Sequence, residues 1–269
     1  MKQLADNLGD PQKVTEAKDL SEAALMKFCA LSDKGQSRKI NQDSCGYYTA
    51  DTGLSFFIVA DGMGGHNAGE VASEIAVNTF INQAKSNGII EKLEQAPDFI
   101  KGAFRRANDI ILYKAAADES RAGMGTTAVA AVVSENKIII GNLGDSRAYI
   151  ISDGKINQIT EDHSYVEQLL KAGSIKEEEA KTHPRRNEIT KALGIEFYYE
   201  PDVFELEYKE GDVLILCSDG LDKMIDDEMI LEIITQESDP ANICQRLVDA
   251  ANTAGGLDNI SVIAVAYER

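Results

Sequence analysis

Short apolar runs in this chain of 269 residues repeatedly lead into an aspartate that lies beside glycine or another small residue. The run "FFIVADG" places Asp61 directly after the apolar segment, and "GNLGDS", "ILCSDG" and "GGLDNIS" contain Asp145, Asp219 and Asp258 in a similar setting. A single Asp-Gly beside a strand is most often a turn. Four strand edges with the same pattern indicate instead that the carboxylates serve a common purpose.

Such a cluster of carboxylates requires compensating positive charge. Buried carboxylates that lie close together repel one another strongly unless cations lie among them, and no matching set of basic residues accompanies the four motifs. Hard divalent cations with oxygen ligands are the natural remedy. The absence of His/Cys ligand spacing favours Mg²⁺ or Mn²⁺ over Zn²⁺.

The pattern of elements indicates antiparallel sheets covered by helices. Short β-branched runs fill much of 24–61 and 126–160, with tight turns at Glu135-Asn136 and Asp153-Gly154. Strands joined by such turns favour antiparallel pairing, and two helix pairs are then available to cover the sheet faces. Helical spacing of apolar residues predicts helices over 70–84, 97–117, 226–237 and 240–253.

The charge balance excludes several classes of partner. Lys and Arg number 27 against 45 Asp and Glu, which gives a formal net charge of −18. Nucleic acids and anionic membranes both require a basic surface, so neither is an expected partner. No apolar stretch approaches the ~18 residues of a membrane span.

The termini and the cysteines indicate a cytoplasmic protein. Residues 1–24 are polar and acidic and are interpreted as an N-terminal extension, because they contain no apolar signal core. Cys29, Cys45, Cys217 and Cys244 are scattered without a Cys-x-x-Cys pair, which favours a reducing compartment and argues against a zinc site.

The motifs, taken in chain order, resemble those of a known family. They are "DKGQSRKINQDS", "VADGMGGHNAGEVAS", "GMGTTAVAA", "GNLGDSRAYI", "EDHSYVEQLLKAG", "HPRRNEITKALG", "GDVLILCSDGLDKM" and "DNISVIAV". Together they resemble the bacterial form of the type 2C metal-dependent serine/threonine protein phosphatases over residues 27–267. The resemblance implies an α+β fold, namely an antiparallel β-sandwich flanked by helix pairs on both faces in four α-β-β-α layers. It also implies a phosphatase domain over 25–269 with a variable flap at about 162–195.

The resemblance further implies a binuclear Mn²⁺ or Mg²⁺ centre. Asp61 corresponds to the residue that bridges both ions, Asp219 and Asp258 to ligands of the first, and the carbonyl of Gly62 to a ligand of the second. Asp145 and Asp219 match positions associated with a third, weaker ion in bacterial members.

Two more residues correspond to catalytic positions of the family. Arg38 matches its phosphate-binding arginine, whose planar guanidinium grips phosphoryl oxygens in a way that lysine could not reproduce. Asp43 matches an acid that orients a metal-bound water. The implied reaction is attack of a metal-bridging hydroxide on phosphoserine or phosphothreonine, without a phospho-enzyme. The implied partners are phosphoproteins modified by a bacterial serine/threonine kinase in signalling, and we expect a monomer.

The chain departs from the family pattern at two positions. Gln42 stands where many relatives have Glu, and we expect it to change the metal affinity without abolishing activity. Met63 stands where animal relatives have a His that is proposed as the general acid. His66, in the same loop, or a metal-bound water could protonate the leaving oxygen instead.

Two alternative functions remain open from the sequence alone. One is a catalytically silent relative that acts as a binding or regulatory module, although such a relative tends to lose its metal ligands. The other is a hydrolase of a small phosphate ester. Arg185 and Arg186 form a rare basic pair in this acidic chain, and they either contact a phosphoprotein or are solvated surface charges.

Overall fold

The alternation of side chains along the strands explains the two-sided core. The computed structural model describes residues 25–63, 68–86, 90–195 and 198–268. In strand β3 (Ser55–Met63), Phe56 and Ile58 join one hydrophobic cluster, while Phe57 and Val59 join another. Successive side chains of a strand point to opposite faces. A strand that is apolar throughout must therefore be covered on both sides.

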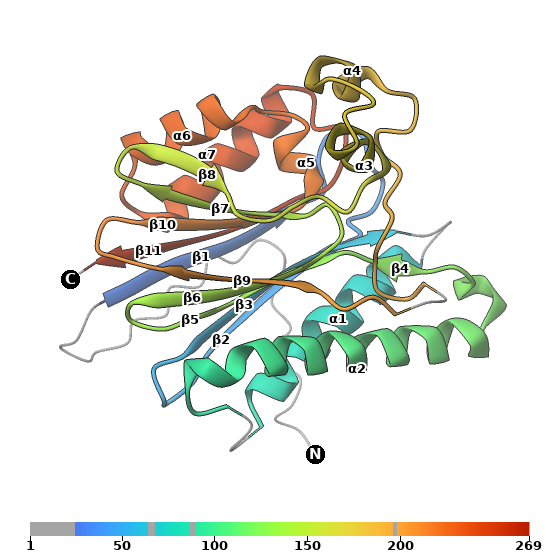
Figure 1. The fold of residues 1–269 in the computed structure, drawn as a ribbon, viewed down its shortest axis with the longest axis horizontal. Coiled ribbons are helices and arrows are strands. Elements are labelled where there is room, and N and C mark those ends of the chain that lie inside the picture. Colours follow the sequence, from blue (N-terminus) through green and yellow to red (C-terminus); the bar gives the residue numbers. More distant parts are fainter. Residues whose placement is uncertain (1–24, 64–67, 87–89, 196–197, 269) are drawn as a thin grey trace.

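Two antiparallel sheets pack face to face in the middle of the molecule (Figure 1). The 5-stranded sheet has the order β1-β11-β10-β7-β8, and the 6-stranded sheet has the order β2-β3-β5-β6-β9 with β4 paired to β3. The other strands are β1 (Leu25–Asp33), β2 (Asp43–Thr49), β4 (Gly125–Thr126), β5 (Ala128–Val133), β6 (Lys137–Leu143), β7 (Arg147–Ser152), β8 (Lys155–Gln158), β9 (Asp202–Glu207), β10 (Val213–Cys217) and β11 (Ile260–Glu268).

Helices cover the outer face of each sheet (Figure 1). Helices α1 and α2 pack on the 6-stranded sheet, and α6 and α7 pack on the 5-stranded sheet, whereas α3 and α4 stand together at one end of the sandwich near α5. The expected four-layer α+β fold is confirmed. The helices are α1 (Gly69–Ala84), α2 (Ala96–Ala117), α3 (Tyr165–Lys171), α4 (Glu177–Thr182), α5 (Asp219–Asp222), α6 (Asp227–Gln236) and α7 (Pro240–Thr253), with short 3₁₀ turns at Leu93–Gln95 and Glu119–Arg121.

The expected elements differ from the structure chiefly near the aspartates. The apolar run of β10 ends at Cys217, and Asp219 begins the short helix α5, which the strand pattern did not predict. The strand expected from residue 126 onward is divided at Thr127 into β4 and β5. The reason is that Thr127 pairs with Asp61 partly through its side chain: the amide of Asp61 donates to Thr127 Oγ1 over 3.0 Å.

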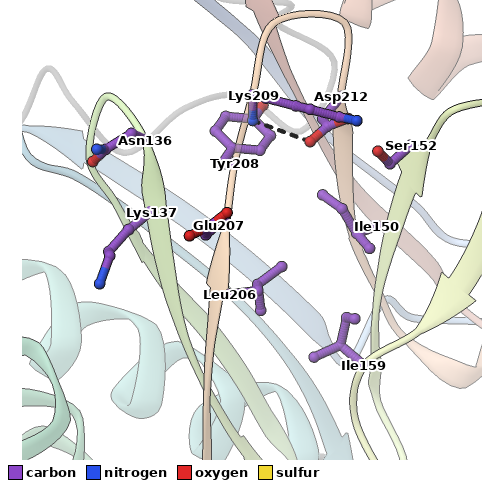
Figure 2. Close-up of a pocket in the computed structure, with 10 residues that line it drawn as sticks. All are labelled: Asn136, Lys137, Ile150, Ser152, Ile159, Leu206, Glu207, Tyr208, Lys209 and Asp212. Carbon is purple, nitrogen blue, oxygen red and sulfur yellow. Dashed lines mark hydrogen bonds between the residues drawn. The ribbon is translucent and has the colours of Figure 1, made fainter.

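A cavity of about 530 Å³ opens between the two sheets at the end opposite to Asp61 and Asp219 (Figure 2). Figure 2 shows Ile150 and Leu206 facing this cavity from strands of the two sheets, with Lys209 and Asp212 at the β9–β10 turn. Within the described residues, no helix has both the length and the apolar character needed to cross a bilayer.

Removing the Phe56 ring tests the core beneath α1 and α2. Phe56 has no exposed surface and packs edge-on against Phe99, with ring centroids 5.3 Å apart. We expect Phe56→Ala to lower the free energy of unfolding by about 3–5 kcal/mol, because the cavity adds to the lost transfer energy. Urea unfolding followed by circular dichroism measures the change. Tyr113→Ala, at a side chain that is 76% exposed, should alter it by less than about 0.5 kcal/mol. Equal effects of the two substitutions would contradict the assignment.

Candidate metal centre

The interior between the two sheets is apolar along most of its length and becomes polar at one end. The side chains of Phe57 and Val59 lie in the cluster between the sheets, and the next residue on the same face of β3 is Asp61. The same alternation by two leads from Leu216 to Ser218, which is fully buried. We call this end of the interior the polar layer. It consists of Ser32, Asp43, Asp61, Thr127, Asn142, Ser146, Ser218 and Ser261.

Hydrogen bonds within the polar layer join the two sheets. Ser218 Oγ donates to Asp43 Oδ2 over 2.7 Å, and the hydroxyls of Thr127 and Ser146 lie 2.7 Å apart. Each of these contacts connects the 6-stranded sheet to the segment that follows or precedes a strand of the other sheet. The polar layer therefore holds the two sheets together and is also part of the candidate metal site.

Asp43 and Asp61 lie directly opposite each other on β2 and β3. Side chains paired in this way share one face, and like charges there are destabilising. Burial raises the pKa of Asp43 to about 7, although the hydrogen bond from Ser218 acts against the shift. Burial also raises the pKa of Asp61 well above its ordinary value, and the neighbouring charge of Asp43 adds to the effect. The two carboxyl groups are therefore stabilised either by binding protons or by cations placed beside them.

The backbone of Asp61 is fixed by the two threonines of the "GMGTT" motif. Thr126 Oγ1 donates to the carbonyl of Asp61 over 2.8 Å, and the Thr127 amide donates to the same carbonyl over 2.9 Å. Both threonines are fully buried. They support the position of Asp61.

The loop before β11 presses against α5 and brings Asp219 and Asp258 to the same region. A Cβ on Gly220 would lie 1.9 Å from the carbonyl oxygen of Asn259, so only glycine permits this approach. Asn259 also fixes its surroundings: its Nδ2 donates to the carbonyls of Lys34 and Ile40, and its Oδ1 accepts from the amide of Gln42. Asn259 is a positioning residue that the sequence analysis missed.

Gly62, expected to offer a carbonyl to an ion, lies where β3 meets the N-terminus of α1. A Cβ at Gly62 would lie 2.1 Å from the Gly69 carbonyl oxygen and 2.5 Å from that of Gln42. The Gln42 side chain donates to Glu70 Oε2 over 3.3 Å. The segment that contains His66 lies outside the described residues.

Asp145 follows β6 and is held in place through the preceding glycine. The Gly144 amide donates to Nδ1 of His163 over 3.0 Å, and the His163 amide donates to the Gly144 carbonyl over 2.9 Å. His163 Nε2 lies 3.0 Å from Asp202 Oδ2, so the ring is fixed at both nitrogens. Burial lowers the pKa of His163, which keeps Nδ1 available as an acceptor. His163 therefore anchors the Asp145 loop at the base of the 162–195 segment.

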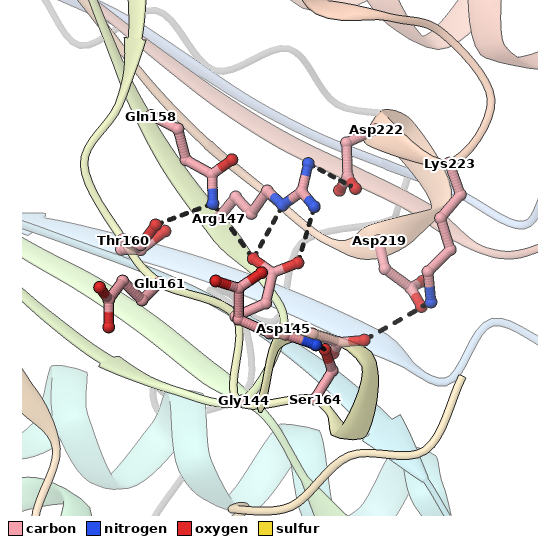
Figure 3. Close-up of polar contacts among 12 residues, drawn as sticks. Gly144, Asp145, Arg147, Gln158, Thr160, Glu161, Ser164, Asp219, Asp222 and Lys223 are labelled. Carbon is pink, nitrogen blue, oxygen red and sulfur yellow. Dashed lines mark hydrogen bonds and ion pairs between the residues drawn. The ribbon is translucent and has the colours of Figure 1, made fainter. Parts of the chain in front are cut away.

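Lys223 places its ammonium between two of the expected metal ligands (Figure 3). It contacts Asp219 one helical turn earlier, and its Nζ lies 3.5 Å from Asp145 Oδ2. Burial opposes the positive charge, but the two carboxylates outweigh this effect and raise the pKa of Lys223. For Asp145, burial and the charge of Asp219 raise the pKa to about 7 in spite of Lys223.

Arg147 forms a second ionic group beside the first. Its guanidinium makes two hydrogen bonds to Asp162, of 2.9 and 2.6 Å, and also reaches Asp222 Oδ2 over 3.0 Å. Figure 3 shows Arg147 and Asp222 next to the Asp219–Lys223 pair. The group joins β7 to α5 and to the start of the 162–195 segment. Neither Asp222 nor Lys223 was singled out from the sequence, although both follow Asp219 in "DGLDK".

Arg38 lies at the exposed edge of the site. Its Nη2 lies 2.7 Å from Asp258 Oδ2, and its side chain is 51% exposed. The predicted phosphate-binding group is therefore next to one predicted metal ligand and open to solvent. Arg185 lies in a different setting, where it pairs with Glu188 and stacks over the Tyr165 ring at 3.5 Å.

The carboxylates offer free oxygens of the kind that hard divalent cations prefer. The Oδ1 atoms of Asp43, Asp145 and Asp219 are buried and have no hydrogen-bond partner among the described residues. In the part of the chain that the structure describes, no group of three or more His, Cys, Asp or Glu side chains is arranged so that these side chains alone could hold a metal ion. Mg²⁺ characteristically keeps several waters and needs only one or two carboxylates. Free carboxylate oxygens of this kind fit such ions, whose remaining ligands would be waters.

Comparison with known proteins agrees with this description. The family model "Protein phosphatase 2C" matches residues 34–252. The chain is 37% identical over 234 residues to the serine/threonine phosphatase stp of Listeria monocytogenes, a match that covers 87% of this chain and 93% of that protein.

Solved structures support the same relationship. The serine/threonine phosphatase of S. agalactiae aligns with a TM-score of 0.85 and 37% identity, over 90% of this chain and 99% of that one. The catalytic domain of the phosphatase PstP, solved in complex with 2 manganese ions, aligns with a TM-score of 0.78 and 32% identity, over 92% of this chain and 100% of that one. The chain belongs to the protein phosphatase 2C family in its bacterial form.

Proposed function

We propose that the chain is a metal-dependent serine/threonine protein phosphatase whose ions bind at the edge of the polar layer, where Asp219 and Asp258 lie near Asp61. The observation that carries the proposal is the convergence of Asp43, Asp61, Asp145, Asp219 and Asp258 from different strands and loops. The charges of the other four all act to raise the pKa of Asp61. A buried group of this kind without added cations would be strongly unfavourable, and a related phosphatase domain was solved with 2 manganese ions.

In this proposal, Asp61, Asp219, Asp258 and the Gly62 carbonyl hold two Mn²⁺ or Mg²⁺ ions. Bound ions would supply positive charge to the phosphoryl group and lower the pKa of an attacking water. The free Oδ1 of Asp43 is available to orient a water, because Ser218 occupies only Oδ2. Thr126 and Thr127 keep Asp61 from moving during this chemistry.

Arg38 is proposed to bind the phosphoryl group of the substrate. Its guanidinium is exposed, and among the described residues its ion-pair partner is Asp258. An ion on Asp258 would compete with Arg38 for that carboxylate, and the freed guanidinium could then donate to two phosphoryl oxygens. Arg38 would thereby add a charged donor at the side of the site that faces solvent.

The retained residues argue against the binding-module alternative. Mutual repulsion makes it costly to keep several buried carboxylates together, and a catalytically silent relative would have no need to keep them. In this chain all of the expected ligand residues are present. The small-ester alternative lacks a comparable supporting observation. The substrates we propose are proteins carrying phosphoserine or phosphothreonine, opposed by a bacterial serine/threonine kinase in signalling.

We further propose a single phosphatase domain over 25–269, with residues 162–195 as a flap. The helices α3 and α4 fall within that flap, and Asp162 and His163 tie its base to the site. We propose a monomer in the cytoplasm. The four cysteines are all unpaired, which supports a reducing compartment.

Metal-dependent turnover is the first test. Full-length protein should hydrolyse a phosphothreonine peptide with Mn²⁺ and lose this activity with a chelator, because the carboxylates alone repel the anionic phosphate. Release of inorganic phosphate measures the reaction, and adenosine monophosphate serves as a small-ester comparison. Folded protein that stays inactive at every Mn²⁺ concentration would favour the binding module.

Removing single carboxylates tests the ligand assignment. We expect Asp61→Asn and Asp219→Asn each to lower kcat/KM by about 10³-fold, equivalent to about 4 kcal/mol of transition-state stabilisation. Steady-state kinetics at saturating Mn²⁺ measures this loss. Asp153→Asn is the matched control, since Asp153 lies in the β7–β8 turn with a side chain that is 78% exposed. Near-normal turnover in either ligand variant would refute the assignment.

Metal removal should also reveal how the buried carboxylates respond to pH. Asp43 and Asp145 have pKa values of about 7 in the folded chain, against an ordinary 3.8. Between these values the folded form holds a proton that the unfolded form has released. Stability therefore falls as pH rises, by up to about 1.4 kcal/mol per pH unit for each group.

Thermal unfolding of chelated protein between about pH 5 and pH 7 measures this effect. We expect the Tm to fall across the range, and Mn²⁺ to remove or reverse the fall because it binds the ionised form. The double variant Asp43→Asn, Asp145→Asn should show a flatter profile without metal. A Tm that rises with pH in chelated wild-type protein would contradict the assigned burial.

A further inference from the structure

The ammonium of Lys223 lies between the two carboxylates that the family resemblance associates with a third ion. It contacts Asp219 directly and lies 3.5 Å from Asp145 Oδ2. Its backbone is fixed as well, since the Lys223 amide donates to the Asp219 carbonyl over 3.0 Å at the end of α5. The spacing of four residues in the helix brings the ammonium back over Asp219.

Both carboxylates keep one oxygen free beside this ammonium. Asp145 Oδ1 and Asp219 Oδ1 are buried without partners, and the Asp145 side chain is only 5% exposed. The pair is therefore attractive to a cation. Lys223 already provides a positive charge there, and this charge cannot diffuse away because it is part of the chain.

With all of its carboxylates ionised, this part of the structure carries the negative charge that two divalent ions would neutralise. Seven carboxylates and three cationic side chains interact in this part of the described structure, which leaves four negative charges. Two divalent cations supply four positive charges. The carboxylates are those of Asp43, Asp61, Asp145, Asp162, Asp219, Asp222 and Asp258, and the cationic side chains are Arg38, Arg147 and Lys223.

We propose that Lys223 is a tethered cation that occupies the Asp145–Asp219 pair and excludes a third divalent ion from it. The inference rests on the proposed metal centre and refines the number of ions. A third ion would have to share the carboxylates with the ammonium or displace it into solvent, where its charge-assisted hydrogen bonds are lost. Asp145 then serves to hold Lys223 in place of a metal.

Counting bound Mn²⁺ tests the proposal without relying on activity. Chelated and dialysed full-length protein is titrated with MnCl₂ by calorimetry, and the electron paramagnetic resonance signal of free Mn²⁺ gives the number of ions bound. We expect two ions on the wild-type chain. Lys223→Met and Lys223→Gln should each bind a third ion at least about tenfold more tightly than wild type does, because a repelling unit charge has been removed. Two neutral variants are used so that a folding defect in one does not decide the test.

Three controls separate charge from other effects of the substitution. Lys223→Arg should keep the wild-type count of ions, because it keeps the positive charge. Adding Asp145→Asn to Lys223→Met should remove the third ion, because the pair is broken. Lys209→Met, at an exposed lysine that pairs with Asp153, should change nothing.

The outcomes distinguish a failure of the role proposed for Lys223 from a failure of the proposed metal centre. If wild type binds two ions and the neutral variants bind the same number with unchanged affinity, the role of Lys223 is refuted while the metal centre stands. A tight third ion on wild type, or weaker binding of the first two in the neutral variants, would also overturn it. If no chain binds Mn²⁺, the metal centre itself is wrong, and the inference about Lys223 fails with it.

Discussion

Electrostatic repulsion among buried carboxylates is the constraint on which the rest of this site depends. Asp43 and Asp61 are directly paired across two strands, and Asp219 and Asp258 raise the pKa of both. A protein core normally excludes such a group because each unpaired charge is costly to desolvate. The fold tolerates it at the polar end of the interior, where hydroxyl groups from both sheets provide hydrogen bonds. The same arrangement that weakens the chain without cations makes it a strong site for them.

The chain partly neutralises the carboxylates with its own cationic side chains. Lys223 bridges Asp145 and Asp219 within the site, whereas Arg38 contacts Asp258 at its exposed edge. The different exposure gives the two cations different roles. The Arg38 side chain is 51% exposed and is open to an incoming phosphate, whereas that of Lys223 is 34% exposed and lies beside carboxylates with free oxygens. On our proposals, Arg38 sets where the phosphoryl group binds, and Lys223 sets how many ions the site accepts.

Much of the fold followed from strand periodicity, because alternation along a strand is a local property. "FFIVAD" contains both the two-sided core and the carboxylate that follows on the inner face, and "LILCSD" leads in the same way to Ser218. The strand expected over 212–219 was nevertheless too long, since the helix α5 begins at Asp219. Gly220 in this helix packs closely against Asn259, 39 residues later in the chain, and no local sequence pattern reports such a contact.

The sequence by itself determined the family, the sandwich of strands and helices, and the carboxylates that supply oxygen ligands. These features are carried by short motifs and by the spacing of apolar residues. Only the tertiary structure decided which charges meet. Asp145 and Lys223 are 78 residues apart in the chain and come together because Arg147, at the start of β7, pairs with Cys217, at the end of β10, in the 5-stranded sheet. The strength of an ion pair depends on distance and burial, and both are properties of the packed molecule.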